Sequence, residues 1–286
     1  MSWSETVQRF RALAEACRNG DALDEPWAEF RDHVVADKSE PAHLRTVLSE
    51  LRACERDVPR EAVIVLDHGT GTGINLFYLA ALGYRELWGA NVVDKAQSFN
   101  RVFREVLDYA EDRIFVYDGT SLPLADASVD LIVSQTVVEH LSDDHLGAYY
   151  SEEGRVLRGG GRAVHQVPHR LMPYDSHTCT WFIHYAPSAI QAPLYKAFAN
   201  RPEQVGSILF LRWPWVHRRL AQRHIGPTVD RTQERLRSAI DIEDFDGPRG
   251  LRRFLDAFFN APGIGALFRW LAGPLMMLES SSTKQI

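Results

Sequence analysis

The sequence predicts an α/β fold in which a mainly parallel sheet carries helices on both faces. Five short apolar segments, rich in β-branched residues, alternate with segments of helical periodicity between residues 61 and 168. A glycine-rich turn follows the first apolar segment directly, and an aspartate stands at or near the end of each of the first three. Parallel strands joined by right-handed crossovers end on one side, so these aspartates should share one edge of the sheet.

The composition is that of an ordinary globular protein and argues against a nucleic-acid-binding, a disulfide-rich or a zinc-binding protein. The 286 residues, 45% of them hydrophobic, suit one large domain or a core with an appendage, and the net charge of −6 argues against a nucleic-acid binder. Three scattered cysteines suggest neither disulfides nor a zinc site, so we expect a cytoplasmic location. We see neither a signal peptide nor an apolar segment long enough to span a bilayer.

Residues 1–60 are expected to form an N-terminal helical layer on the core. Val7, Phe10 and Leu13 recur at helical spacing, and Pro26 and Pro41 stand where new helices can begin. His43 lies in this layer and could reach the ligand edge, although an exposed or structural role is the simpler interpretation.

Residues 61–168 should form the ligand-binding core. The predicted strands and helices are listed here in chain order: strand 63–66, helix 74–82 ended by Gly83, strand 86–94, helix 99–110, strand 113–118, strand 128–134, helix 142–157, a glycine turn at 159–161, and strand 162–167.

The pattern weakens beyond Pro168. Residues 169–260 are rich in proline, aromatic residues and histidine, and we interpret them as a substrate cap or insertion over the strand ends, with helical stretches near 231–240 and 248–259. Residues 261–286 should return to the core, with 275–278 as a last strand at the sheet edge.

The acidic strand ends distinguish between two ligand classes. Asp67, Asp94 and Asp118 are 27 and 24 residues apart, each interval fitting one strand–helix unit. Carboxylates accept hydrogen bonds from hydroxyls and amines but repel phosphate. Ile74 also stands where the dinucleotide fingerprint needs its third glycine. The pattern therefore favours S-adenosylmethionine, with its sulfonium, ammonium and ribose hydroxyls, over a dinucleotide.

Taken together, these segments resemble the class I S-adenosylmethionine-dependent methyltransferases, a Rossmann-like family that includes small-molecule, quinone, lipid and sugar methyltransferases. The resemblance covers about 63–168, and Gly159 departs from it where the family usually has proline. The matching segments are 65–73, 91–94, 117–123, 128–134, 137–140 and 155–161.

The resemblance implies a role for each matching residue. Asp67 would orient the cofactor's ammonium, Asp94 its ribose hydroxyls and Asp118 its adenine amine. Ser134 and Gln135 would line the sulfonium. The remaining cofactor-binding positions are the loop residues Gly69, Thr70, Gly71 and Gly73 and the backbone of Gly119 and Thr120.

Methyl transfer to a hydroxyl gains from a base near the proton, and histidine is the usual candidate. We expect this base, or a group that orients the acceptor, among His140, His169 and His177, with Tyr174 and Asp175 as helpers. No metal site is expected, since neither a helical histidine pair nor a cysteine set is present.

The sequence thus predicts a methyltransferase acting on a small-molecule, sugar or lipid-linked acceptor, at oxygen, with nitrogen and carbon still open. Seven arginines against two acids in 212–237, interleaved with tryptophans, form either a solvated helix face or a contact for phosphate or a membrane surface. A catalytically inactive cofactor-binding module is the main alternative, and a nicotinamide-dependent oxidoreductase is a further one.

Overall fold

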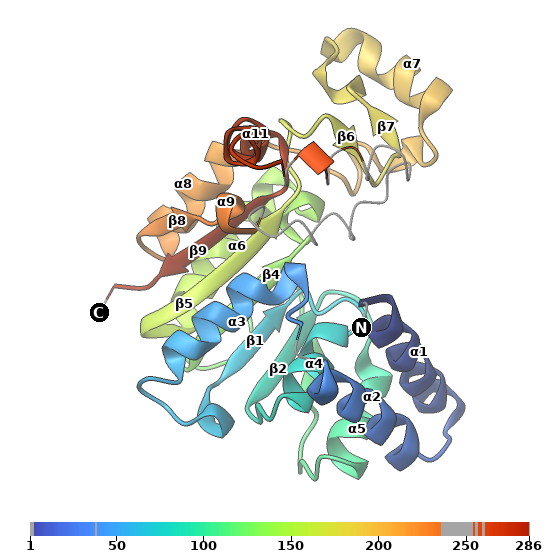
Figure 1. Cartoon of the computed structure of the whole chain (residues 1–286), viewed down its shortest axis with the longest axis vertical. Coiled ribbons are helices and arrows are strands. Elements are labelled where there is room, and N and C mark those ends of the chain that lie inside the picture. Colours follow the sequence, from blue (N-terminus) through green and yellow to red (C-terminus); the bar gives the residue numbers. More distant parts are fainter. Residues whose placement is uncertain (1–2, 38, 236–253, 255–256, 259–260, 286) are drawn as a thin grey trace.

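The computed structural model describes residues 3–37, 39–235, 254, 257–258 and 261–285. Among these residues, a seven-stranded sheet runs through the molecule in the order β3-β2-β1-β4-β5-β9-β8 (Figure 1). The first five of the strands in this order are parallel to one another, β9 is antiparallel to β5, and β8 is antiparallel to β9 and so runs in the same direction as the first five. The predicted α/β class and mainly parallel sheet are confirmed.

The central strands lie close to the predicted segments. They are β1 (Val65–His68), β2 (Leu87–Asn91), β3 (Ile114–Val116), β4 (Val129–Gln135) and β5 (Leu157–Val167). The expected glycine turn at 159–161 is wrong, because β5 already begins at Leu157 and runs through these glycines. A register shift between Val129 and Leu131 of β4 accommodates this irregular start.

The C-terminal return to the sheet differs from the prediction. Strand β9 (Leu278–Thr283) begins where the predicted strand ended, and residue 275 belongs instead to the 3₁₀ helix η8 (Gly273–Leu275). β9 also lies inside the sheet, because the short strand β8 (Thr228–Asp230) pairs with its far side and forms the edge.

One face of the sheet is covered by the N-terminal layer and the first crossover helices. The apolar side chains of this face, such as Val65, Leu131 and Val164, share one core with these helices. The helices are α1 (Trp3–Asn19), α2 (Asp24–Ala36), η1 (Ala42–Leu44), α3 (Arg45–Cys54), η2 (Arg60–Ala62), α4 (Ile74–Ala81), η3 (Gln97–Phe99) and α5 (Asn100–Glu105). The expected helical layer at the N-terminus is therefore present.

The opposite face is covered by α6 (Asp143–Val156) and α8 (Pro214–His224). Leu66, Ile132 and Ala163 point into a second core with these helices, as expected for strands whose side chains alternate between two buried faces. The sheet thus lies between two helical layers.

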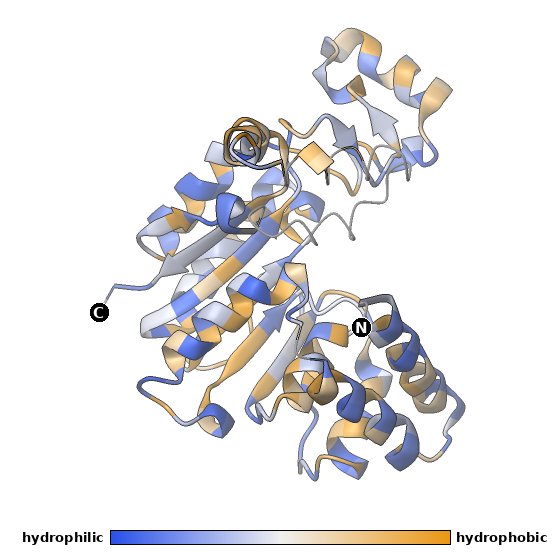
Figure 2. Cartoon of the chain, viewed as in Figure 1, coloured by the Kyte–Doolittle hydropathy of each residue, from blue (hydrophilic) through white to orange (hydrophobic). Residues whose placement is uncertain are grey.

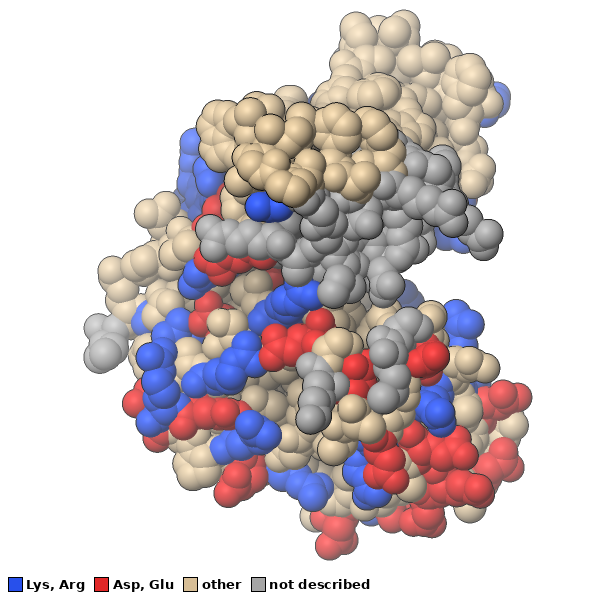
Figure 3. Space-filling view, in the orientation of Figure 1, with Lys and Arg blue, Asp and Glu red and all other residues tan. Residues whose placement is uncertain are grey.

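Residues 169–213 project from the carboxyl ends of the strands, in the upper part of Figure 1. They contain the hairpin β6 (Tyr174–Asp175) and β7 (Thr180–Trp181), then η5 (Ile183–Tyr185), α7 (Ser188–Phe198) and η6 (Pro202–Gln204). Their surface carries few charged side chains in Figure 3, whereas acids gather over the N-terminal helices.

The predicted cap, 169–260, is too long. Residues 214–230 belong to the core, because α8 packs on the sheet and β8 extends it. The short helix α9 (Thr232–Arg235) falls within the first predicted helical stretch. The rest of that stretch, and most of 248–259, lie outside the described residues.

Helix α11 (Gly265–Ala272) precedes η8 and is mainly apolar, as Figure 2 shows. Its exposed side chains include Leu267, Trp270 and Leu271. Within the described part of the chain, no helix combines the length and the apolar character needed to cross a membrane.

Candidate functional site

The loop between β1 and α4 has the backbone that its glycines predict. Gly69, Gly71 and Gly73 all have positive φ, at 94°, 57° and 84°. At Gly69, a Cβ would lie 2.2 Å from Cγ2 of Val137, the residue before η4 (Val138–His140). Gly69 therefore lets the loop pass against the segment that follows β4, and any side chain would push the two apart.

The same loop is held tightly on the neighbouring strand. The Gly69 amide donates to the Ala90 carbonyl at 2.8 Å, and the Thr70 hydroxyl donates to the Asp67 carbonyl at 2.7 Å. A Cβ on Gly89 of β2 would lie 2.6 Å from the Thr70 hydroxyl oxygen. Thr70, which is buried, thus shapes the loop through its side chain.

Asp67 presents a buried carboxylate at the loop. It is 4% exposed, and its Oδ2 has no hydrogen-bond partner among the described residues. Burial raises the pKa of this carboxyl to about 7. An unpartnered buried acid is costly unless a ligand satisfies it, so Asp67 fits a cationic or hydrogen-bond-donating group such as the predicted ammonium.

The end of β2 differs from the prediction. The strand stops at Asn91, whose Oδ1 accepts a hydrogen bond from the Gly71 amide at 3.1 Å, while its Nδ2 has no partner among the described residues. Asp94 lies three residues further on, is exposed, and accepts a 3.4 Å bond from the Gln97 amide. An amide therefore stands where we expected the strand to end in a carboxylate.

Asp118 follows β3 and organises its own turn. Its carboxylate accepts the amides of Thr120 and Ser121 at 2.8 and 3.0 Å, and the Thr120 hydroxyl at 2.7 Å. These hydrogen bonds lower the pKa of Asp118 to about 2. Gly119 has a positive φ of 82°, so the turn holds a permanent carboxylate at the strand end.

The last two residues of β4 point to opposite faces. Ser134 is buried toward α6, and its hydroxyl lies 2.8 Å from that of Tyr149, so this side chain is engaged below the sheet and does not line the edge. Gln135 lies on the other face, donating to the His43 carbonyl at 2.7 Å and accepting from Asn75 at 2.9 Å.

His43 brings the N-terminal layer to this edge. Its carbonyl accepts hydrogen bonds from Gln135 and from Gln166 of β5, each at 2.7 Å. The expected proximity of His43 to the ligand edge is therefore seen, with the backbone making the contact.

The chain leaves β4 through a strained residue. Thr136 has a φ of 52°, which is rare for a β-branched residue and concentrates at functional sites. The following segment is tied down by Arg212, whose guanidinium donates to the carbonyls of Val138 and Leu141 at 3.2 and 2.6 Å. The helical turn η4 is thus held in one position.

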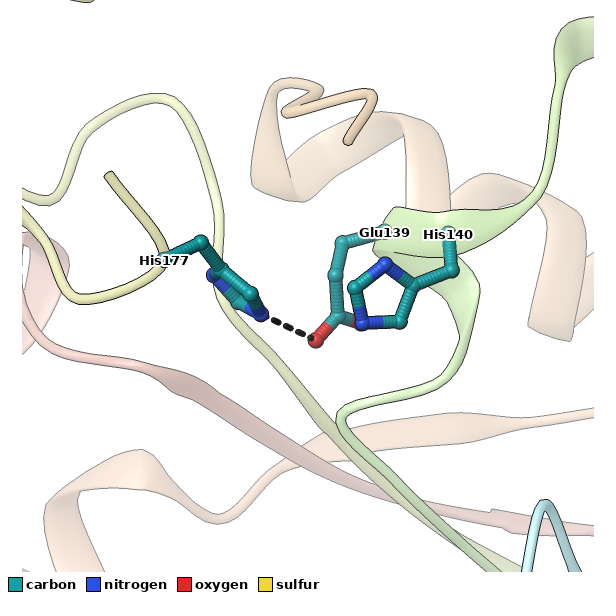
Figure 4. Close-up of side chains that lie close together, drawn as sticks. All are labelled: Glu139, His140 and His177. Atoms are coloured by element: carbon teal, nitrogen blue, oxygen red, sulfur yellow. Dashed lines mark ion pairs between the residues drawn. The ribbon is translucent and has the colours of Figure 1, made fainter. Parts of the chain in front are cut away.

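Three side chains converge beyond this turn: Glu139, His140 and His177. The ligand-type atoms of all three lie within 4.8 Å of one another, and Nε2 of His177 is 3.8 Å from Oε1 of Glu139 (Figure 4). Glu139 is fully buried, and neither carboxylate oxygen has a hydrogen-bond partner among the described residues. Burial raises the pKa of Glu139 to about 8.

The two histidines are oriented by their other ring nitrogens. Nδ1 of His140 lies 2.6 Å from the Ile208 carbonyl, and Nδ1 of His177 lies 3.3 Å from Oδ1 of Asp175. The bond to Asp175 raises the pKa of His177, whereas burial lowers that of His140. Two of the three predicted histidines thus lie together, and Asp175 contacts one of them.

His169 does not join them. Its Nε2 lies 2.7 Å from the Met276 carbonyl, and its Nδ1 accepts the Leu171 amide at 3.2 Å. Burial lowers its pKa to about 4, and it lines a separate cavity of about 590 Å³ with Trp215 and Trp270. Both ring nitrogens of His169 therefore have hydrogen-bond partners within the fold, and the role of a base that we expected for it stays a prediction.

Three of the seven arginines in 212–237 form ion pairs among the described residues. Arg212 bonds to Asp143 as well as to η4, Arg218 to Asp230, and Arg231 to Glu234. These pairs reduce the positive charge that the segment offers to a phosphate or a membrane.

Sequence reasoning misplaced the end of β2 and gave Glu139 no role of its own. β2 ends at Asn91, where it pairs with Val116 of β3, and this pairing is visible only in the three-dimensional structure. Glu139 was noticed as part of a motif, but its burial depends on the distant segment around Phe210, whose amide donates to the Glu139 carbonyl at 2.7 Å.

Part of the chain is similar to known methyltransferases. Residues 66–165 match the family model described as "Methyltransferase domain". An uncharacterized methyltransferase from Mycobacterium sp. (strain JLS) is 36% identical over 149 residues, which cover 51% of this chain and 55% of that protein. Another, from Mycobacterium sp. (strain KMS), is 42% identical over 95 residues, which cover 32% of this chain and 36% of that protein. The matches thus span about half, or less, of the curated relatives.

Solved structures of low sequence identity are also similar. The geranyl diphosphate C-methyltransferase of Streptomyces coelicolor A3(2) is 16% identical with a TM-score of 0.48, covering 90% of this chain and 84% of that one. A putative sarcosine dimethylglycine methyltransferase from Galdieria sulphuraria is 19% identical with a TM-score of 0.48, covering 84% and 83%. Neither likeness identifies an acceptor. The match over residues 66–165 shows that this part of the chain is a methyltransferase domain, and the glycine loop with the buried Asp67 carboxylate lies within it.

Proposed function

We propose that this protein transfers a methyl group from S-adenosylmethionine to an oxygen of a small-molecule, sugar or lipid-linked acceptor. One observation carries the proposal: the glycine loop with the unpartnered Asp67 carboxylate contacts, through Gly69 and Val137, the segment that bears Glu139 and His140. A cofactor loop and a set of proton-handling side chains are thus adjacent in space.

The described residues fit the cofactor. Asp67 would hold the ammonium group, and the loop backbone at Gly69, Thr70, Gly71 and Gly73 leaves room for a close approach. We assign the ribose to Asn91 together with Asp94, since the free Nδ2 of Asn91 can donate to a hydroxyl oxygen. The turn at Asp118, Gly119 and Thr120 would meet the adenine.

S-adenosylmethionine supplies a methyl group on a positively charged sulfur, and the protein must place the acceptor in line with it and exclude water. In this proposal, Glu139, His140 and His177 would orient an acceptor hydroxyl and take its proton. Their fixed positions, set by Arg212, Ile208 and Asp175, favour a pre-organised role.

Calorimetry of the full chain with S-adenosylmethionine, S-adenosylhomocysteine and NAD tests the cofactor half of the proposal. We expect binding of the first two and none of NAD; the reverse result would indicate an oxidoreductase. Incubation with methyl-labelled cofactor and a panel of alcohols, phenols, sugars and lipid-linked sugars then tests transfer. Cofactor binding with no labelled product from any acceptor would favour the inactive module.

A further inference from the structure

The strongest unexplained feature of the molecule is the carboxylate of Glu139. It is 0% exposed and has no hydrogen-bond partner among the described residues, although a buried acid normally has one. Nε2 of His177 lies 3.8 Å from Oε1 of Glu139, which is beyond hydrogen-bonding distance. Something that binds oxygen strongly would satisfy this group.

The neighbouring histidines are arranged as metal ligands usually are. In metal sites, a ligating imidazole commonly donates its other ring N–H to a carbonyl or a carboxylate, which fixes the tautomer and the ring orientation. His140 places Nδ1 on the Ile208 carbonyl, and His177 places Nδ1 on Asp175. Nε2 of each ring is then the unprotonated nitrogen available for a ligand, and Nε2 of His177 points toward Glu139 in Figure 4.

The spacing is compatible with one ion. The three ligand atoms lie within 4.8 Å of one another, and ligands about 2.1 Å from a shared metal are roughly 3.0–3.4 Å apart. Side-chain rotations that move each ligand atom by about 1 Å would close this difference. His177 lies in the turn between β6 and β7, outside the two strands, whereas η4 is held by Arg212.

We propose that Glu139, His140 and His177 bind a divalent transition-metal ion on the acceptor side of the methyl-transfer site. Two imidazoles and one carboxylate favour Zn²⁺, Fe²⁺, Mn²⁺ or Co²⁺ over Mg²⁺ and Ca²⁺, which prefer oxygen ligands. His140 is exposed, so coordination positions on that side face solvent and can take an oxygen of the acceptor. This proposal departs from our expectation from sequence that no metal site is present.

The role of the ion rests on the proposed function, but its binding does not. If methyl transfer takes place here, the ion would bind the acceptor hydroxyl, lower the pKa of that hydroxyl and hold its oxygen toward the methyl group. His140 and His177 would then act as ligands in place of a base.

Binding of Co²⁺ and Zn²⁺ to the metal-free full chain, without any cofactor, tests the site. We expect one ion per chain with micromolar or tighter affinity, and a Co²⁺ visible spectrum without a thiolate charge-transfer band. Glu139→Gln and His177→Ala should each weaken binding at least tenfold. His145→Ala is the matched control, since His145 is an exposed histidine of α6 outside the cluster, and it should bind as the unaltered protein does.

Thermal unfolding of each variant without metal shows whether it is folded, and His140→Ala provides a second ligand variant should Glu139→Gln unfold. Absence of stoichiometric binding, or equal binding by the ligand variants and His145→Ala, would overturn the proposal. If metal binding is absent but S-adenosylmethionine still binds, only the metal proposal fails. If the metal binds but S-adenosylmethionine does not, only the methyltransferase proposal fails.

Discussion

His68 and Glu153 form a buried pair between strand β1 and helix α6, with Nδ1 of His68 2.9 Å from Oε1 of the carboxylate. The second carboxylate oxygen lies 2.7 Å from Nε2 of His165 on β5, and all three side chains are at most 1% exposed. His68 directly precedes Gly69. This network therefore fixes the strand end from which the cofactor loop begins.

Glu153→Gln should destabilise the protein strongly, because one amide cannot accept hydrogen bonds from both rings and leaves a buried nitrogen unsatisfied. We expect the free energy of unfolding in urea at neutral pH to fall by about 3 kcal/mol. Glu29→Gln is the control, since the exposed pair of Glu29 with Arg9 should contribute about 0–1 kcal/mol. Equal unfolding midpoints for the two variants would contradict this account.

Stability should also depend on pH through Glu153. Burial alone would raise the pKa of this carboxyl, but the charges and hydrogen bonds of His165 and His68 outweigh it and lower the pKa from 4.5 to about 2. The unfolded chain therefore takes up the proton first as the pH falls. We expect the unfolding free energy to decline from about pH 4.5 to about pH 2. Urea titrations of the unaltered protein and of Glu153→Gln should show a shallower decline in the variant.

Affinity for S-adenosylmethionine should rise with pH through Asp67. Because burial raises the pKa of Asp67 to about 7, the carboxylate that attracts the ammonium group forms only as the pH passes this value. We expect calorimetric affinity to increase up to about tenfold per pH unit between pH 6 and 7, and to level off by about pH 8. Asp67→Asn should bind weakly and without this dependence. If the affinity of Asp67→Asn for S-adenosylmethionine still rises with pH, a group other than Asp67 causes the effect.

Two variants distinguish the ribose contacts. Asn91→Ala removes a side chain that bonds to the Gly71 amide, and we expect it to weaken cofactor binding by about 1–3 kcal/mol. Asp94→Ala alters an exposed residue outside the strand and should cost less. Isothermal titration with S-adenosylhomocysteine measures both. A larger loss for Asp94→Ala would restore the carboxylate to the role that the sequence suggested.

The first half of the fold was predictable because its signals are local. An apolar strand, a glycine loop and an amphipathic helix each occupy a short window, and their repetition implies the parallel sheet. Strand β8 was missed because its three residues pair with Ser280–Ser282, about 50 positions further along the chain. Only that distant pairing makes Thr228–Asp230 a strand.

The site was predictable in part for the same reason. Asp67 and Asp118 lie within motifs, whereas Asn91 and Asp94 differ by three positions, a shift within the usual uncertainty of a strand end. The grouping of Glu139 with His177 depends on how the hairpin of β6 and β7 folds back over η4. The spacing of Glu139 and His177 along the chain does not predict that contact.

The position of β9 has a consequence for biosynthesis. β9 pairs with β5 on one side and β8 on the other, so β8 has no strand partner, and β5 is paired only with β4, until residues 278–283 have been made. Until then β5 is a bare edge that can pair with another nascent chain. Synthesis of β9 therefore covers an edge of the sheet that could otherwise pair with another chain.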